Sequence, residues 1–392
     1  MPGPDLFDQL LRLHGAEELG RSYLYVRLAR YSVAGELDYS EISRILSGIR
    51  RRADWPRVWS AAAGRHEALA RAAEGRGAKV SAGDAYLRAA LCHHWGSMFA
   101  EGATKSTDHA RSVELYRRGA PYYRPPSHRI EVPFESDHLP AYVRMPPAVE
   151  HPPVVLMIGG ADTNKEELHH WGTELTLRGF CVVPFDGPGQ GELAARYGRL
   201  TMRFDTFHLA VAAVIDHLES LYPELDLDKV GIFGNSLGGY LALDAALRDH
   251  RVKAVISNGG FADARSLDRW PPPVLAAFSS CLGIDDLTEV AGHIREHIDI
   301  SKAPHANTPA ALIVHGGRED LSDEAEAGAA AEAVGGTLLV VEDAWHTCSN
   351  RDHLVSSVFG DWMAAALDDP GFASTQRTVR AIDETGYADL FA

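Results

Sequence analysis

The sequence contains few cysteines. Its 392 residues include 4 of them (Cys92, Cys181, Cys281 and Cys348), far apart and without a Cys-x-x-Cys pair. Isolated cysteines of this kind are typical of reduced thiols and exclude a disulfide framework. We therefore expect a cytoplasmic protein without disulfides.

Long apolar runs are also missing. No stretch approaches the 18 apolar residues that a membrane-spanning helix needs, and the N-terminal "MPGPDLFDQLLRLHG" contains acids and no long apolar core. The sequence therefore predicts neither a membrane span nor a signal peptide.

An excess of basic residues is absent as well. The chain has 38 Lys and Arg against 54 Asp and Glu, which gives a formal net charge of −16. A protein that binds nucleic acids or anionic membranes needs a local excess of Lys and Arg. The dense basic run at 50–52 is typical of a solvated helix end. The expected partner is a small-molecule substrate, not a nucleic acid or a membrane.

The histidines do not predict a metal centre. The pairs His93-His94 and His169-His170 and the scattered remainder show no His-Glu-x-x-His or similar ligand spacing. We expect no metal and no other cofactor.

What is present divides the chain in two. Residues 1–124 show apolar residues at helical spacing, for example in 4–13, and almost no strand signal. The Pro-rich "PYYRPPSHR" should end the last helix. We therefore predict a helical domain over 1–124 and a second domain over 125–392.

The pattern of residues 125–392 predicts an α/β fold. "RIEVPFE" and "LPAYVRM" predict a hairpin, and six apolar runs follow, at 153–158, 180–185, 229–234, 252–257, 310–315 and 337–342. Amphipathic stretches separate them, at 164–178, 203–221, 237–248 and 323–334. Apolar strands that alternate with helices indicate a mostly parallel sheet covered on both faces, here of eight strands. The gap over 258–308 is too long for a simple crossover and predicts an insertion near the carboxyl edge.

The stretch "GNSLG" (234–238) lies between a strand pattern and a helix pattern. It matches Gly-x-Ser-x-Gly, in which a serine occupies a strained strand-to-helix turn with its hydroxyl above the sheet edge. Bulky side chains at Gly234 and Gly238 would collide with the adjoining elements. Ser236 is therefore the predicted nucleophile.

A serine needs a base and an acid to become nucleophilic, and this fold supplies them in the order Ser, acid, His. His346, in "DAWHTCSN" after the last strand, is the predicted base, and His353 should lie in the next helix. After the strand at 310–315 comes "HGGREDLSD", where Glu319 and Asp320 both qualify. The pattern H-G-x-x-D followed by an apolar residue favours Glu319, whereas one extra turn residue would select Asp320.

Two backbone N–H groups should form the oxyanion hole. One belongs to Leu237, and the other to Ala161, or alternatively Gly160, in the loop after "PVVLMI". The next residues fit a capping box from Thr163 to Glu166, which makes Lys165 and Glu167 first-turn helix residues, not catalysts.

With these residues assembled, the chain resembles a known family. "FDGPGQGE" (185–192), "GGADTNKEE" (159–167), the joint and hairpin of 121–146 and "HTCSN" carry the resemblance. They are similar to α/β-hydrolases of the group containing 2,6-dihydroxypseudooxynicotine hydrolase and the fungal hydrolases that shorten polyketide naphthopyrones. Esterases of the fermentation-respiration-switch type are more distant relatives.

The resemblance implies cofactor-free hydrolysis of a carbon–carbon bond next to a ketone, a helical lid and a possible homodimer. The nicotine-pathway enzyme has an extra glutamate about thirty residues after the nucleophile. Here Trp270 is near that position, with Asp263 and Asp268 as the nearest carboxylates. We therefore expect a different aromatic or polyketide-like substrate.

Other functions could use the same site residues. The chain could hydrolyse a carboxylic ester or lactone, or pass the acyl group to an internal nucleophile as an acyl-transfer or cyclisation enzyme. Candidate substrate-binding residues are His94, Trp95, Tyr123 and Trp270, for each of which simple packing is the alternative. A non-catalytic binding protein is disfavoured because Ser236 and His346 both stand in their expected contexts.

Overall fold

A computed structural model describes residues 32, 36–100, 102–195, 200–369, 371–372, 377–381 and 386–391. The chain separates after Ser127 into two compact units, which are described individually. The helix expected over 4–13 lies outside the described residues.

The first unit is helical. Its elements are α3 (Tyr39–Ser47), α4 (Asp54–Gly75), α5 (Lys79–Met98), α6 (Gly102–Gly119) and the 3-10 turn η2 (Ala120–Tyr122). α5 packs against both α4 and α6. Three buried tryptophans centre the core, since Trp59 has its ring 5.9 Å from that of Trp55 and 6.0 Å from that of Trp95. Burying aromatic area of this size stabilises such a bundle.

The second unit contains one sheet of nine described strands. They are β1 (His128–Phe134), β2 (Asp137–Val143), β3 (Pro153–Ile158), β4 (Cys181–Phe185), β5 (Asp226–Asn235), β6 (Val252–Asn258), β7 (Ala310–Gly316), β8 (Thr337–Val341) and β9 (Thr378–Ala381). Their order across the sheet is β1-β2-β4-β3-β5-β6-β7-β8-β9. β2 runs antiparallel to β1 and β4, and all pairs from β4 to β9 are parallel.

The predicted count of eight strands is wrong by one. The hairpin and the six apolar runs form strands at their expected places, and β9 adds a parallel edge beside β8. β9 has only four residues, and just Val379 and Ala381 of them are buried. So short an alternation carries little signal of its own, because pairing with a neighbouring strand stabilises it.

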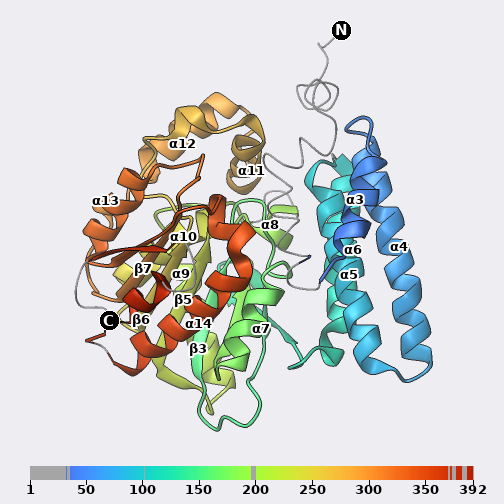
Figure 1. Ribbon diagram of the computed structural model, residues 1–392, viewed down its shortest axis with the longest axis horizontal. Helices are drawn as coiled ribbons and strands as arrows, with labels where there is room; N and C mark the ends of the chain where they lie inside the picture. Colours follow the sequence, from blue (N-terminus) through green and yellow to red (C-terminus); the bar gives the residue numbers. More distant parts are fainter. Residues whose placement is uncertain are drawn as a thin grey trace. The chain divides into compact units, whose positions relative to one another are not determined.

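Helices cover both faces of the sheet, as the alternating pattern predicts. α7 (His169–Leu177) and α14 (Asp352–Asp368) lie on one face, and α9 (Phe207–Leu221) and α10 (Leu237–Arg248) lie on the other (Figure 1). α13 (Glu324–Val334) packs on β7 and β8, and the short α8 (Gly191–Ala195) follows β4. Strand residues pack with α7 and α14 in one buried core, which includes Trp171 of α7, Phe233 of β5 and Trp362 of α14.

The long connection between β6 and β7 is helical. It contains the 3-10 turn η3 (Leu267–Arg269), α11 (Pro272–Leu282), α12 (Leu287–His297) and the turn η4 (Ile300–Lys302). Two further 3-10 turns, η5 (His346–Arg351) and η6 (Gly386–Leu390), follow β8 and β9. Among the described residues, no helix has the length and apolar character needed to cross a membrane.

Candidate active site

Ser236 occupies the turn between β5 and α10 in a strained conformation, with φ 57° and ψ −124°. Residues other than glycine rarely adopt positive φ, and those that do are often found at active sites. The two flanking glycines permit this turn. A Cβ on Gly234 would lie 2.1 Å from the carbonyl oxygen of Gly238, and one on Gly238 would lie 2.2 Å from that of Ile158. Both close approaches are to backbone, so the serine turn requires glycine on either side.

His346 links Ser236 to Glu319 by two hydrogen bonds. Its Nε2 lies 2.9 Å from the hydroxyl oxygen of Ser236, and its Nδ1 lies 2.6 Å from Oε2 of Glu319. A proton on Nδ1, donated to the carboxylate, leaves Nε2 able to accept the serine proton. These three residues come from the ends of β5, β7 and β8, which the parallel sheet brings to one edge.

Of the two adjacent acids, Glu319 is the one that contacts His346. Its side chain is 0% exposed. Its other oxygen, Oε1, accepts the backbone N–H groups of Asp320 and Leu321 at 3.1 and 2.9 Å. Asp320 is exposed, and no hydrogen bond joins its carboxylate to the imidazole. This arrangement agrees with the sequence register that favoured Glu319.

The His346–Glu319 pair has shifted acidities. Burial lowers the pKa of His346, but the charge and hydrogen bond of Glu319 raise it by a larger amount. The net pKa therefore lies above its usual value of 6.5. For Glu319, burial raises the pKa, while the opposing effects of His346 and of the Leu321 N–H leave the net pKa lowered. The negative charge of Glu319 favours the protonated form of His346, so the pair stabilises an imidazolium.

Asn258, which no sequence motif marks, ties the serine turn to the histidine loop. Its backbone carbonyl accepts the N–H of Ser236 at 2.8 Å. Its side-chain Nδ2 donates to Oδ1 of Asn235 at 3.1 Å and to the carbonyl of Thr347 at 2.9 Å. Asn258 is completely buried. It therefore fixes the spacing between the serine turn and the loop that carries His346.

The predicted oxyanion-hole residues lie close to Ser236. A Cβ on Gly160 would be 3.1 Å from the Cβ of Ser236, so the 159–161 loop passes directly beside the serine. Leu237 is the first residue of α10, and first-turn N–H groups have no partner within their own helix. Among the described residues, no hydrogen bond uses the N–H of Ala161 or Leu237.

An aromatic cluster lies next to His346. The ring of Phe261 is 6.4 Å from the imidazole, centre to centre, at an interplanar angle of 18°. Trp270 is 4.6 Å from Phe261 and 5.2 Å from Phe278, and its indole N–H donates to the carbonyl of Leu321 at 2.7 Å. Trp270 is thus tied to the segment that carries Glu319.

The two carboxylates considered near Trp270 are paired with arginines. Asp263 accepts hydrogen bonds from the backbone N–H, Nε and Nη2 of Arg265, and Asp268 accepts one from Arg295 at 2.5 Å. Asp268 has 85% of its side chain exposed. Neither carboxylate has a hydrogen bond to His346 or Ser236.

Three of the four residues suggested for substrate binding belong to the helical unit, where they have packing partners. Trp95 is completely buried against Trp59, and its carbonyl accepts the indole N–H of Trp55 at 2.6 Å. His94 is buried with its ring 6.3 Å from that of Trp95. The hydroxyl of Tyr123 donates to the carbonyl of Tyr116 at 3.2 Å. A role for these residues in substrate binding stays a prediction.

His353 takes its expected place in the helix after the histidine loop, and Cys348 lies within that loop. His353 is exposed in the first turn of α14. Cys348 is completely buried, and burial raises the pKa of its thiol well above the usual range. A buried, protonated thiol is a packing group, not a nucleophile.

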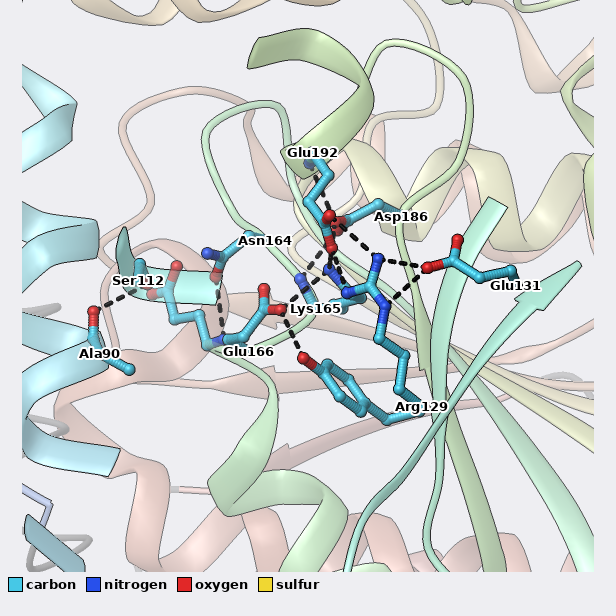
Figure 2. Close-up of polar contacts among 11 residues, drawn as sticks. Ala90, Ser112, Arg129, Glu131, Asn164, Lys165, Glu166, Asp186 and Glu192 are labelled. Atoms are coloured by element: carbon cyan, nitrogen blue, oxygen red, sulfur yellow. Dashed lines mark hydrogen bonds and ion pairs between the residues drawn. The ribbon is translucent and has the colours of Figure 1, made fainter. Parts of the chain in front are cut away.

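Lys165 corrects the capping-box interpretation. α7 begins at His169, after Leu168, so Thr163 and Glu166 do not cap it. Lys165 is 0% exposed and donates to Asp186 at 2.9 Å and to Glu192 at 2.5 Å, with Glu166 also 2.9 Å away (Figure 2). Burial lowers the pKa of Lys165, but these carboxylates raise it by a larger amount, so the net pKa lies above its usual value. Lys165 is therefore a buried cation that joins two loops. Glu167, expected beside it as a first-turn helix residue, also lies before α7 and is buried.

No group of three or more His, Cys, Asp or Glu side chains in the described ranges could hold a metal ion. The chemistry that this arrangement supports is nucleophilic attack by a serine hydroxyl, with an imidazole as base and backbone N–H groups nearby.

Known proteins share this arrangement of elements. A family model described as serine aminopeptidase, S33 matches residues 150–284. Over 317 residues the chain is 29% identical to 2,6-dihydropseudooxynicotine hydrolase of Paenarthrobacter nicotinovorans, covering 80% of this chain and 84% of that protein. It is 37% identical over 237 residues to 20-hydroxy-prefusarin hydrolase FUS2 of Gibberella moniliformis. That alignment covers 56% of this chain and 55% of the fungal protein, so the chain spans about half the length of that relative.

A solved structure matches the fold over most of its length. The crystal structure of 2,6-dihydroxy-pseudo-oxynicotine hydrolase superposes with a TM-score of 0.79 at 28% identity, covering 86% of this chain and 95% of that one. The sheet, the serine turn and these similarities agree with the resemblance carried by the two glycine-rich motifs. The chain therefore has the α/β-hydrolase fold and is similar to 2,6-dihydropseudooxynicotine hydrolase and to fungal hydrolases.

Proposed function

We propose that this α/β-hydrolase is a serine hydrolase that cleaves a carbon–carbon bond adjacent to a ketone in an aromatic or polyketide-like substrate. Ser236 is the nucleophile, His346 the general base and Glu319 the residue that orients and stabilises the imidazolium. The observation that carries the proposal is the pair of hydrogen bonds, 2.9 and 2.6 Å long, that joins the three side chains.

The reaction begins when Ser236 attacks the ketone carbon and its proton passes to Nε2 of His346. The N–H groups of Leu237 and of Ala161 or Gly160 donate to the oxyanion that forms. The carbon–carbon bond then breaks, its electron pair leaves with the departing group as an enolate, and the proton on His346 passes to the enolate carbon to give a ketone. Water, activated by His346, releases the carboxylic acid from Ser236.

Two observations support carbon–carbon cleavage and an aromatic substrate. The similarity to 2,6-dihydropseudooxynicotine hydrolase extends over 80% of this chain, and the family resemblance implies cleavage next to a ketone. Phe261, Trp270 and Phe278 place aromatic surface beside His346. A substrate of this kind must also delocalise the carbanion of the leaving group, which a β-diketone does.

The direct test is a product assay. Purified protein is incubated separately with an aryl β-diketone and with an aryl ester of matched size, and the products are identified by mass spectrometry. We expect the diketone to be split into a carboxylic acid and a methyl ketone by the wild type and not by Ser236→Ala. Cleavage of the ester alone would contradict the carbon–carbon proposal and make the protein an esterase.

The dependence of kcat/KM on pH provides a second test. His346 acts as a base only when neutral, so activity falls as pH drops through its pKa. Because Glu319 raises the pKa of His346 above 6.5, the acid limb of the wild-type profile should lie above pH 6.5. In Glu319→Gln the half-buried imidazole loses its anionic partner, so we expect this limb to move to lower pH. An acid limb at the same pH in Glu319→Gln and the wild type would mean that a group other than His346 sets it.

A further inference from the structure

Gln190, in the "FDGPGQGE" motif, is the side chain that holds the loop beside Ser236. Its Nε2 donates to the carbonyl of Gly159 at 2.6 Å and lies 3.4 Å from that of Gly160. Its Oε1 accepts the N–H of Gly187 at 3.3 Å. Gln190 is only 1% exposed, so water does not replace these bonds.

These bonds fix the direction of the neighbouring N–H groups. A peptide unit is planar and trans, so its N–H points away from its C=O. Holding the Gly159 carbonyl therefore sets the N–H of Gly160, and holding the Gly160 carbonyl sets the N–H of Ala161. The next carbonyl, that of Ala161, accepts a bond from Sγ of Cys281 at 3.2 Å. Each peptide unit of the loop is thus anchored through its carbonyl oxygen.

The Gln190 loop is itself held by the buried ion cluster. Asp186 accepts the backbone N–H of Lys165 at 2.9 Å and that of Glu192 at 3.1 Å, while Arg129 binds both oxygens of Glu192 (Figure 2). Burial raises the pKa of Glu192, but Lys165 and Arg129 lower it by a larger amount. The net pKa therefore lies well below the usual range. Two loops that are separate in the sequence therefore form one rigid unit around Gln190.

We propose that Gln190 is the positioning residue of the oxyanion hole. It keeps the carbonyls of Gly159 and Gly160 turned away so that an N–H group of this loop, together with that of Leu237, meets the oxyanion. The inference rests on the proposed function, because it assigns a role in the same reaction. It holds whether Ala161 or Gly160 provides the second N–H, since Gln190 anchors both peptide units.

The test compares Gln190→Met with Asn164→Ala. Methionine keeps the length and approximate volume of glutamine but cannot donate to the carbonyls, and Tm reports whether the variant folds. Asn164 is a matched control, because it is buried and its Oδ1 accepts the N–H of Glu167 at 3.0 Å, so its removal breaks a bond in the same loop without freeing Gly159 or Gly160. We would measure kcat and KM with the substrate that the wild type cleaves, the inhibition constant of an aryl trifluoromethyl ketone, and Tm.

For Gln190→Met we expect kcat to fall about 10- to 100-fold with KM nearly unchanged, because the lost interaction stabilises the oxyanion and not the ground state. The trifluoromethyl ketone, which forms an oxyanion with the serine, should bind more weakly by a similar factor. Asn164→Ala should keep both values within about threefold, in line with the loss of one hydrogen bond.

Two results would overturn the inference. One is a Gln190→Met protein with wild-type kcat and inhibitor affinity, and the other is an equal loss in Asn164→Ala, which would indicate general loosening of the loop. Failure of the proposed function is distinguishable, because then the wild type itself would neither cleave a substrate nor bind the trifluoromethyl ketone.

Discussion

Ser236→Ala should lower kcat by about 10⁵- to 10⁶-fold, the scale seen when a triad nucleophile is removed. The substitution deletes the atom that attacks the carbonyl carbon and leaves the hydrogen bond between His346 and Glu319 intact. The measurement is kcat by mass-spectrometric product formation under saturating substrate, with Tm as a check on folding. We expect little change in Tm, because alanine removes a single oxygen from the turn.

Ser257→Ala is the matched control for this experiment. Ser257 is a buried serine on β6, directly opposite Gly234 on β5, and its hydroxyl has no hydrogen-bond partner among the described residues. Its removal should leave kcat within about threefold, as expected for a side chain outside the reaction. Retention of activity in Ser236→Ala, or equal losses in both variants, would contradict the assignment of Ser236.

The second large effect is expected from the two adjacent acids. Glu319→Gln should lower kcat about 10³- to 10⁴-fold, because the amide cannot stabilise the imidazolium and can favour the wrong tautomer of His346. Asp320→Asn should cost only a few-fold, since Asp320 is exposed and only Glu319 bonds to the imidazole. Both values come from the same steady-state assay.

The reversed order would make Asp320 the catalytic acid. This outcome is distinct from unfolding, because Glu319→Gln keeps the size of the side chain and Tm reports on stability. Equal small losses in both variants would show that no carboxylate at this position assists His346.

Local pattern was sufficient for the parts of the site that depend on chain order. The run 153–158 corresponds to β3 and the stretch 237–248 to α10, because apolar strands and an amphipathic helix leave clear periodicities. The register of "HGGREDLSD" pointed to Glu319, and the loop after the last long apolar run contained His346. In each case the residue type and its place after a strand carry the information.

Features that depend on distant partners could not be predicted. "TNKEE" fits a helix start, but Lys165 is buried against Asp186 and Glu192, which are 21 and 27 residues later in the chain. β9 is stabilised by pairing with β8 and has two buried residues of its own. Asn258 and Gln190 are polar residues whose roles follow from carbonyl groups that only the folded chain brings near them. No periodicity or spacing marks such contacts.

The activation of Ser236 as a nucleophile by His346 and Glu319 can be tested without knowing the substrate. The measurement is the rate of covalent labelling by a small aryl fluorophosphonate, followed by intact mass and peptide mapping. The serine oxygen displaces fluoride and its proton passes to His346, so we expect one adduct, on Ser236, that forms much more slowly in Glu319→Gln than in Asp320→Asn. No adduct in the wild type, or labelling that persists unchanged in Ser236→Ala, would contradict the account.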